Sequence, residues 1–230
     1  AALGVDAVWV LTFDAATSRL SGEAFVRRLA QSPGGLEAVC VGADFVFGHR
    51  RSGNVALLRQ LGGELGFEVV ALPPVLLDGV AVSSTRIREV VRRGDFADAS
   101  RLLGRDYALA GTVVRGEGLG RKLGFPTANL DTRGLVLPPN GVYAARARLN
   151  ERDWPAVVNI GVRPTIEPAQ TVPRVETHLL DFEGDLLGRE LELILGARLR
   201  DEQRFPNPEA LRAQIARDVV EAKKILRADS

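Results

Sequence analysis

The residues with the clearest chemical potential lie between positions 115 and 130, where the sequence reads RGEGLGRKLGFPTANL. Glycines let a backbone approach a ligand closely, and cations together with backbone N–H groups offset phosphate charge. A proline followed by Thr and Asn supplies a stiff backbone and short oxygen-bearing side chains that suit Mg²⁺. We therefore predict a nucleotide loop with Thr127 and Asn129 as metal ligands. The predicted nucleotide-binding residues are Gly116, Gly118, Gly120, Arg121, Lys122, Gly124, Pro126, Thr127 and Asn129.

The glycine-rich stretch matches neither a Walker A motif nor the dinucleotide-binding pattern. Its glycines alone would fit an ordinary flexible β-turn equally well. The cations Arg121 and Lys122, together with the two oxygen-bearing side chains, favour the nucleotide interpretation. Because Thr127 and Asn129 are two residues apart, an extended backbone would direct both side chains to the same side.

A second candidate, RVETHLLDF at residues 174–182, places Glu176 and His178 on one face of an otherwise apolar strand. A carboxylate there could belong to a structural ion pair or to an exposed edge. Alternatively, a partly desolvated Glu176 gains basicity and could accept a proton from a substrate hydroxyl as a general base. For His178 we expect packing or a hydrogen bond rather than metal ligation.

A third candidate is the start of a predicted helix at Ser83, Ser84 and Thr85. The N-terminal amides and the positive dipole end of a helix favour phosphate. Arg88 lies one turn from Ser84, where it could add charge to such a site. An ordinary helix cap with solvent-exposed arginines is the alternative interpretation.

The first half of the chain alternates strand and helix patterns, which implies a parallel sheet with helices on its faces. We expect a buried strand from Ala7 to Phe13. Two helices should follow Ser83, with a break at Gly94-Asp95 and an end at Gly104. The remaining elements are a helix over residues 21–30 capped at Ser21, a strand and loop over 36–48, a helix over 54–65 and a strand over 67–75.

The second half contains short β-type runs between turn residues, with no helix between them, which predicts an antiparallel barrel or sandwich. These runs start at Tyr107, Gly141, Trp154, Arg174 and Glu190. A helix should close the chain, capped by Asn207 and with Pro208 at its first position. Its apolar face would be Leu211, Ile215, Val219, Ala222 and Leu226. The change of pattern near Arg105 predicts two domains, residues 1–105 and 106–230.

The composition permits two modest cores: 230 residues, of which 46% are hydrophobic and 26% charged. A net charge of +1 gives no overall field that would favour nucleic acid or an anionic membrane. The single cysteine, Cys40, excludes an internal disulfide, fits a reducing compartment and is expected in the core. The sequence shows no leader and no membrane span, so we expect a cytoplasmic protein. We expect small-molecule partners, and the sequence is compatible with a homo-oligomer.

Residues 107–230 resemble the riboflavin kinase family. The resemblance rests on GTVVRGEGLGRKLGFPTANL, followed by GVYAARARL, VVNIGVRPT and VETHLLDF. It implies a small antiparallel β-barrel with a C-terminal helix, a glycine loop that closes over the nucleotide, and ATP with Mg²⁺ held at Thr127 and Asn129. Glu176 corresponds to the family's proposed base. Riboflavin as the substrate comes only from this resemblance.

The first half resembles the latter part of an FMN adenylyltransferase, through VGADFVFG and VSSTRIREVV. In bacteria this domain is commonly fused to the kinase and converts FMN to FAD. The implied fold is an incomplete Rossmann-like, nucleotidyltransferase-like α/β domain before the barrel. The implied adenylyltransferase site residues are Asp44, Ser84, Thr85 and Arg88.

One departure from the family concerns its histidine-bearing loop near the start of the adenylyltransferase domain. The histidines of this sequence are His49 and His178, and neither lies in such a loop. We therefore expect an N-terminally truncated bifunctional enzyme that forms FMN but little FAD. The rival interpretations are a monofunctional kinase with a structural α/β domain and a flavin-binding regulatory module without turnover.

Overall fold

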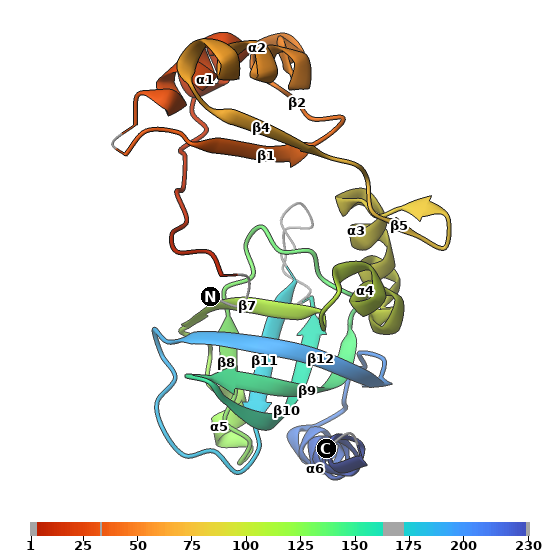
Figure 1. The fold of residues 1–230 in the computed structure, drawn as a ribbon. Coiled ribbons are helices and arrows are strands. Elements are labelled where there is room, and N and C mark those ends of the chain that lie inside the picture. The colour runs from red at the N-terminus through yellow and green to blue at the C-terminus, as the bar shows by residue number, and fades with distance from the viewer. Residues whose placement is uncertain (1–3, 33, 163–172, 229–230) are drawn as a thin grey trace. The chain divides into compact units, whose positions relative to one another are not determined.

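The computed structural model describes residues 4–32, 34–162 and 173–228. The chain forms two compact units, Ala1–Ala81 and Val82–Ser230. Both units are drawn in Figure 1.

The first unit is built on two parallel strands, β1 (Ala38–Gly42) and β4 (Glu68–Leu72). The helices α1 (Gly22–Ala30) and α2 (Val55–Leu65) pack against each other beside this sheet. Their apolar core contains Val26, Leu58, Leu61 and Phe67. The predicted parallel pairing and both helices are confirmed.

Each of these helices begins at a side-chain cap. Ser21 accepts a hydrogen bond from the backbone of Ala24, and Asn54 accepts one from Leu57. Such caps satisfy backbone donors that would otherwise lack partners in the first turn. The short elements of this unit are η1 (Thr17–Arg19), β2 (Val46–Phe47), η2 (His49–Arg51), β3 (Gly53–Asn54), β5 (Leu76–Leu77) and β6 (Val80–Ala81).

Two expectations for this unit were wrong. The segment from Ala7 to Phe13 is not a buried strand: it has no regular secondary structure, and Val8 is 83% and Phe13 80% exposed. An apolar run becomes a strand only where a neighbouring strand receives its hydrogen bonds, and β1 pairs only with β4 in the described sheet. Cys40 is exposed rather than in the core, because it points to the face of β1 opposite the inward Val39 and Val41.

The second unit begins with two helices, α3 (Ser84–Arg93) and α4 (Phe96–Leu103). Gly94 and Gly104 end them in the left-handed conformation that glycine adopts at low cost. The ring of Phe96 stacks on Tyr107, with ring centroids 6.1 Å apart. The helices therefore belong to the same compact unit as the strands that follow, while the functional boundary near Arg105 stays a prediction.

Six antiparallel strands of this unit close into a barrel, in the order β10-β11-β8-β7-β12-β9. Of the two architectures predicted, the barrel is confirmed. Side chains that alternate along each strand fill its interior, including Tyr143, Ile160, Val175 and Leu193. The strands are β7 (Ala108–Val114), β8 (Ala128–Leu130), β9 (Gly141–Leu149), β10 (Arg152–Gly161), β11 (Arg174–Leu179) and β12 (Glu190–Arg200).

Two helices accompany the barrel. A short helical turn, α5 (Leu119–Lys122), lies inside the glycine-rich stretch, for which the sequence predicted a nucleotide loop with a flexible β-turn as the alternative. The C-terminal helix α6 (Pro208–Ala228) starts with the predicted Asn207 cap, whose side chain accepts from Ala210. It packs against β9, β10 and β12 (Figure 1). Across the described part of the chain, helices as long and as apolar as a membrane crossing requires do not occur.

Candidate functional site

A cavity of about 350 Å³ lies on the outside of the barrel. The glycine-rich loop, strands β8, β11 and β10, and helix α6 all contribute to its walls. On β11 the inward residues Val175, Thr177 and Leu179 are buried, so Glu176 and His178 point to the opposite, outer face. The barrel interior is thus a packed core, and the outer surface carries the site.

Strand register aligns the polar residues of this cavity in one row. Glu176 on β11 pairs with Asn129 on β8 and, on its other side, with Asn159 on β10. The same row continues to Val142 on β9 and Arg200 on β12. All five residues line the cavity. The predicted base and one predicted metal ligand are therefore nearest neighbours across a rigid ladder.

The glycine-rich loop packs directly on the Phe-Pro-Thr-Ala-Asn segment. A Cβ added to Gly116 would overlap the amide group of Asn129, with the Asn129 Cγ at 2.6 Å. A Cβ added to Gly120 would overlap the carbonyl oxygen of Phe125 and lie 3.0 Å from the Thr127 Oγ1. The two halves of the predicted nucleotide motif are thus in contact. At Gly120 the overlap would be with backbone, so the contact requires glycine there, whereas a Cβ at position 116 would displace the Asn129 amide.

The predicted loop residues differ in their positions. The cavity is lined by four of them: Gly118, Gly120, Thr127 and Asn129. An adjoining cavity is lined by Gly116 and, again, Asn129. The remaining four predicted residues are exposed and line neither cavity: Arg121, Lys122, Gly124 and Pro126.

An ion pair joins the loop to β11. The Arg174 Nη1 lies 3.1 Å from the Glu117 Oε1, and both side chains line the cavity. Both are about half exposed, so solvent screens the pair and its contribution to stability is small. Arg174 shares its face of β11 with Glu176 and His178.

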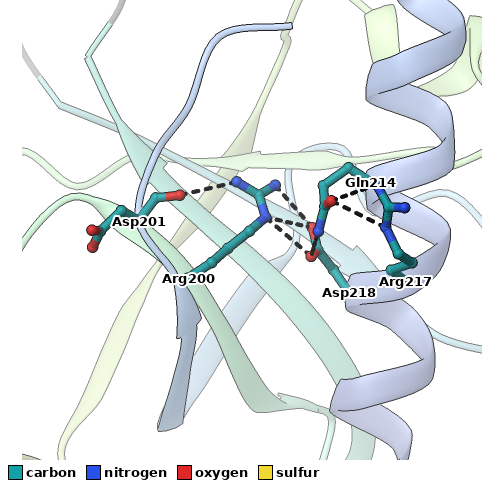
Figure 2. A network of polar contacts seen from close by, with 5 residues as sticks. All are labelled: Arg200, Asp201, Gln214, Arg217 and Asp218. Atoms are coloured by element: carbon teal, nitrogen blue, oxygen red, sulfur yellow. Dashed lines mark hydrogen bonds and ion pairs between the residues drawn. The ribbon is translucent and has the colours of Figure 1, made fainter.

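Figure 2 shows a polar network between β12 and α6 that the sequence did not predict, and two of its members, Arg200 and Asp218, line the cavity. The Arg200 guanidinium makes a bidentate contact with Asp218 of α6, with Nε to Oδ1 at 3.0 Å and Nη2 to Oδ2 at 2.9 Å. The Gln214 side chain donates to the same carboxylate at 2.8 Å. The Asp218 side chain is only 5% exposed and that of Arg200 19%. The pair fixes α6 to the end of β12, and loss of one partner would leave a buried charge unpaired.

Asn159, Arg174, Arg200 and Asp218 are therefore site residues that sequence reasoning missed. Asn159 carried a usable signal, since it is a polar residue within the apolar strand sequence AVVNIG. Arg200 and Asp218 carried none, because only the fold brings β12 and α6 together.

The predicted adenylyltransferase residues are all exposed. Ser84, Thr85 and Arg88 lie in the first turns of α3, where the preceding Ser83 is the cap and accepts from the Arg86 backbone at 3.2 Å. Asp44 lies in the turn between β1 and β2, in the other compact unit. Their assignment to one site stays a prediction.

The second unit is thus a closed barrel whose outer face carries a polar cavity beside a glycine-rich loop, and the first unit has an α/β fold. Two family models match the chain: the riboflavin kinase model matches residues 103–226 and the FAD synthetase model residues 1–86. The chain belongs to the family of bifunctional riboflavin kinase/FMN adenylyltransferases.

Individual proteins show how far the similarity extends. The bifunctional riboflavin kinase/FMN adenylyltransferase of Pseudomonas fluorescens is 42% identical over 96% of this chain and 71% of its own length. That of Escherichia coli K12 is 40% identical over 96% and 70%. A solved structure described as a macrolide-efflux protein from Streptococcus pneumoniae is 26% identical, with a TM-score of 0.66 over 92% of this chain and 67% of that one.

Proposed function

We propose that the second unit phosphorylates riboflavin to FMN at the cavity on the outer face of the barrel. The observation that carries this proposal is the register of β8 and β11, which places Glu176 opposite Asn129. The riboflavin kinase family indicates the substrate. The strand register supports the assignment of a base beside a nucleotide loop.

The chemical step is an in-line transfer of the γ-phosphoryl group of ATP. Glu176 accepts the proton of the ribityl 5′-hydroxyl. At the same time the hydroxyl oxygen bonds to the γ-phosphorus, and the bond between that phosphorus and the ADP oxygen breaks. Backbone N–H groups of the glycine-rich loop offset the charge on the transferring group. Glu176 lies on a barrel strand rather than a loop, so its carboxylate is held in place before the substrate binds.

The side chains of Thr127 and Asn129 fit a bound Mg²⁺. Both offer neutral oxygen ligands, and Mg²⁺ typically combines a few such ligands with water and phosphate oxygens. The packing of Gly116 and Gly120 against these residues limits their movement. The ion would supply charge compensation to the β- and γ-phosphates of ATP.

We further propose that the family's second activity, adenylyl transfer from ATP to FMN, uses Asp44, Ser84, Thr85 and Arg88. The N-terminal amides of α3 and the Arg88 guanidinium offer positive charge to phosphate. Chromatographic measurement of the FAD formed from FMN and Mg-ATP, by the unchanged chain and by Arg88→Ala, tests this.

The finer cellular assignments are also proposals. A cytoplasmic location agrees with ATP and flavins as small-molecule partners, and we propose no nucleic-acid or membrane partner. Light scattering of the purified chain would decide whether it forms a homo-oligomer.

The experiment that tests the kinase assignment is incubation of the chain with riboflavin, ATP and Mg²⁺, followed by separation of the flavins. We expect FMN to accumulate with one ADP released per FMN. Hydrolysis of ATP without FMN formation would contradict the assignment.

A further inference from the structure

His178 connects strand β11 to the segment that carries Thr127. Its Nδ1 lies 2.8 Å from the carbonyl oxygen of Pro126, which is 52 residues away in the sequence. Its ring meets the ring of Phe125 edge-on, with centroids 5.6 Å apart and an interplanar angle of 87°. Because a carbonyl oxygen can only accept, Nδ1 must carry the proton and donate it.

This contact begins where the backbone pairing stops. The β8–β11 ladder runs from Leu130 opposite Val175 to Ala128 opposite Thr177, and it ends there. Thr127 immediately precedes Ala128, the first β8 residue of the ladder, and Pro126 precedes Thr127. The carbonyl of Pro126 is held by the side chain of His178. The hydrogen bond therefore extends the attachment of this segment to β11 past the last ladder pair.

The same segment is attached to the glycine-rich loop on its other side. The backbone N–H of Phe125 donates to the carbonyl of Gly120 at 2.9 Å. Thr127 thus follows a short piece of chain that is held by α5 from one side and by His178 from the other. Two described contacts join this piece to the strand of Glu176, the hydrogen bond to Pro126 and the ring contact with Phe125, and both come from His178.

We propose that His178 is a positioning residue for the kinase reaction: its Nδ1–H fixes Thr127 at a set distance from Glu176. His178 and Glu176 are two residues apart on the same face of β11, so one strand sets both the base and the metal-ligand segment. With Nδ1 as the donor, Nε2 of the neutral ring is an acceptor. This inference rests on the kinase function proposed above.

Two substitutions separate the hydrogen bond from the ring packing. His178→Asn keeps an N–H donor close to the position of Nδ1 but removes the ring. His178→Phe keeps an aromatic edge toward Phe125 but removes the donor. A role limited to packing predicts that Phe preserves function and Asn does not, and a positioning role predicts the reverse.

We expect His178→Phe to raise the KM for Mg-ATP by about two- to tenfold, the effect of losing one hydrogen bond. The KM for riboflavin should change little, and His178→Asn should restore the KM for Mg-ATP to within about twofold of the unchanged chain. An unchanged KM for Mg-ATP in His178→Phe, or equal impairment of both variants, would overturn the inference.

A measurement on the unchanged chain keeps the test independent of whether the variants fold. Nitrogen-15 NMR of the imidazole groups at neutral pH reports which ring nitrogen carries the proton. The chain has two histidines, and the signal lost in His49→Gln, a change in the other compact unit, identifies the remaining signal as that of His178. We expect His178 to carry its proton on Nδ1, and a proton on Nε2 would overturn the inference. Failure of the unchanged chain to form any FMN would contradict the kinase function itself.

Discussion

Glu176 on β11 lies directly opposite Asn129 on β8, in a ladder that also pairs Thr177 with Ala128. Side chains paired in this way have Cβ atoms about 4.5–5.5 Å apart. The proposed base and the proposed metal ligand are therefore spaced by backbone hydrogen bonds of the barrel and not by a loop. The relative position of these two residues is therefore fixed by the fold before a substrate binds.

Replacement of Asn129 by Ala should weaken the use of Mg-ATP, because one oxygen ligand and the partner of Gly116 are both lost. We expect a rise in the Mg²⁺ concentration needed for half-maximal rate, and Thr127→Ala should act in the same direction. Asn54→Ala is a matched control, since its side chain caps α2 in the other compact unit and does not line the cavity. Equal Mg²⁺ dependence in Asn129→Ala and Asn54→Ala would rule out the ligand assignment.

Gly120→Ala should impair the site through backbone overlap. The added Cβ would meet the carbonyl oxygen of Phe125, which cannot move without displacing Thr127. We expect a large loss of Mg-ATP affinity in titration calorimetry with little change in melting temperature, since the loop lies outside the core. Gly63→Ala in α2 is the control, because a Cβ there meets nothing within 4 Å. If both variants bind Mg-ATP like the unchanged chain, the loop does not pack as described.

The glycine-rich loop should close over the bound nucleotide. Four glycines between positions 116 and 124 make its ordering costly in conformational entropy, and a half-exposed ion pair is its side-chain connection to β11. Hydrogen exchange of residues 115–124 should slow when Mg-ADP is added. Identical exchange with and without Mg-ADP would refute closure.

Stability should fall at alkaline pH through Tyr107. Burial raises the pKa of its phenol to about 12, from an ordinary value of 10.0. The folded state thus holds the proton more tightly than the unfolded chain, so this stability is present below pH 10 and is lost as the pH rises toward 12. Urea unfolding of the unchanged chain and of Tyr107→Phe at pH 9 and pH 11 measures the effect. We expect a smaller loss between these pH values in Tyr107→Phe, and equal losses would contradict the assignment.

The features that could be predicted from the sequence depend on local rules. Ser21, Ser83 and Asn207 cap helices because their side chains satisfy nearby backbone donors. The alternation of Val175 and Glu176 placed the carboxylate outside the apolar core. The prediction of packing or a hydrogen bond for His178 is confirmed, since its ring contacts Phe125 and its Nδ1 contacts the Pro126 carbonyl, although neither partner could be foreseen.

The features that could not be predicted depend on register and on neighbours. Arg200 and Asp218 meet only because α6 packs against β12, and nothing local indicates that pairing. Asn159 joins the row of Glu176 only through the β10–β11 register. The prediction of a strand from Ala7 to Phe13 was wrong for the same reason, since an apolar run does not specify which neighbouring strand would pair with it.

Glu176→Gln is the decisive test of whether Glu176 is the base of a riboflavin kinase. The change keeps the size of the side chain and its capacity to hydrogen-bond while removing the basic oxygen. The measurement is the single-turnover rate of FMN formation from riboflavin and Mg-ATP, with binding of both ligands measured in parallel. We predict that Glu176→Gln binds both nearly as well as the unchanged chain and forms FMN roughly two to four orders of magnitude more slowly. A near-normal rate in Glu176→Gln would contradict the account.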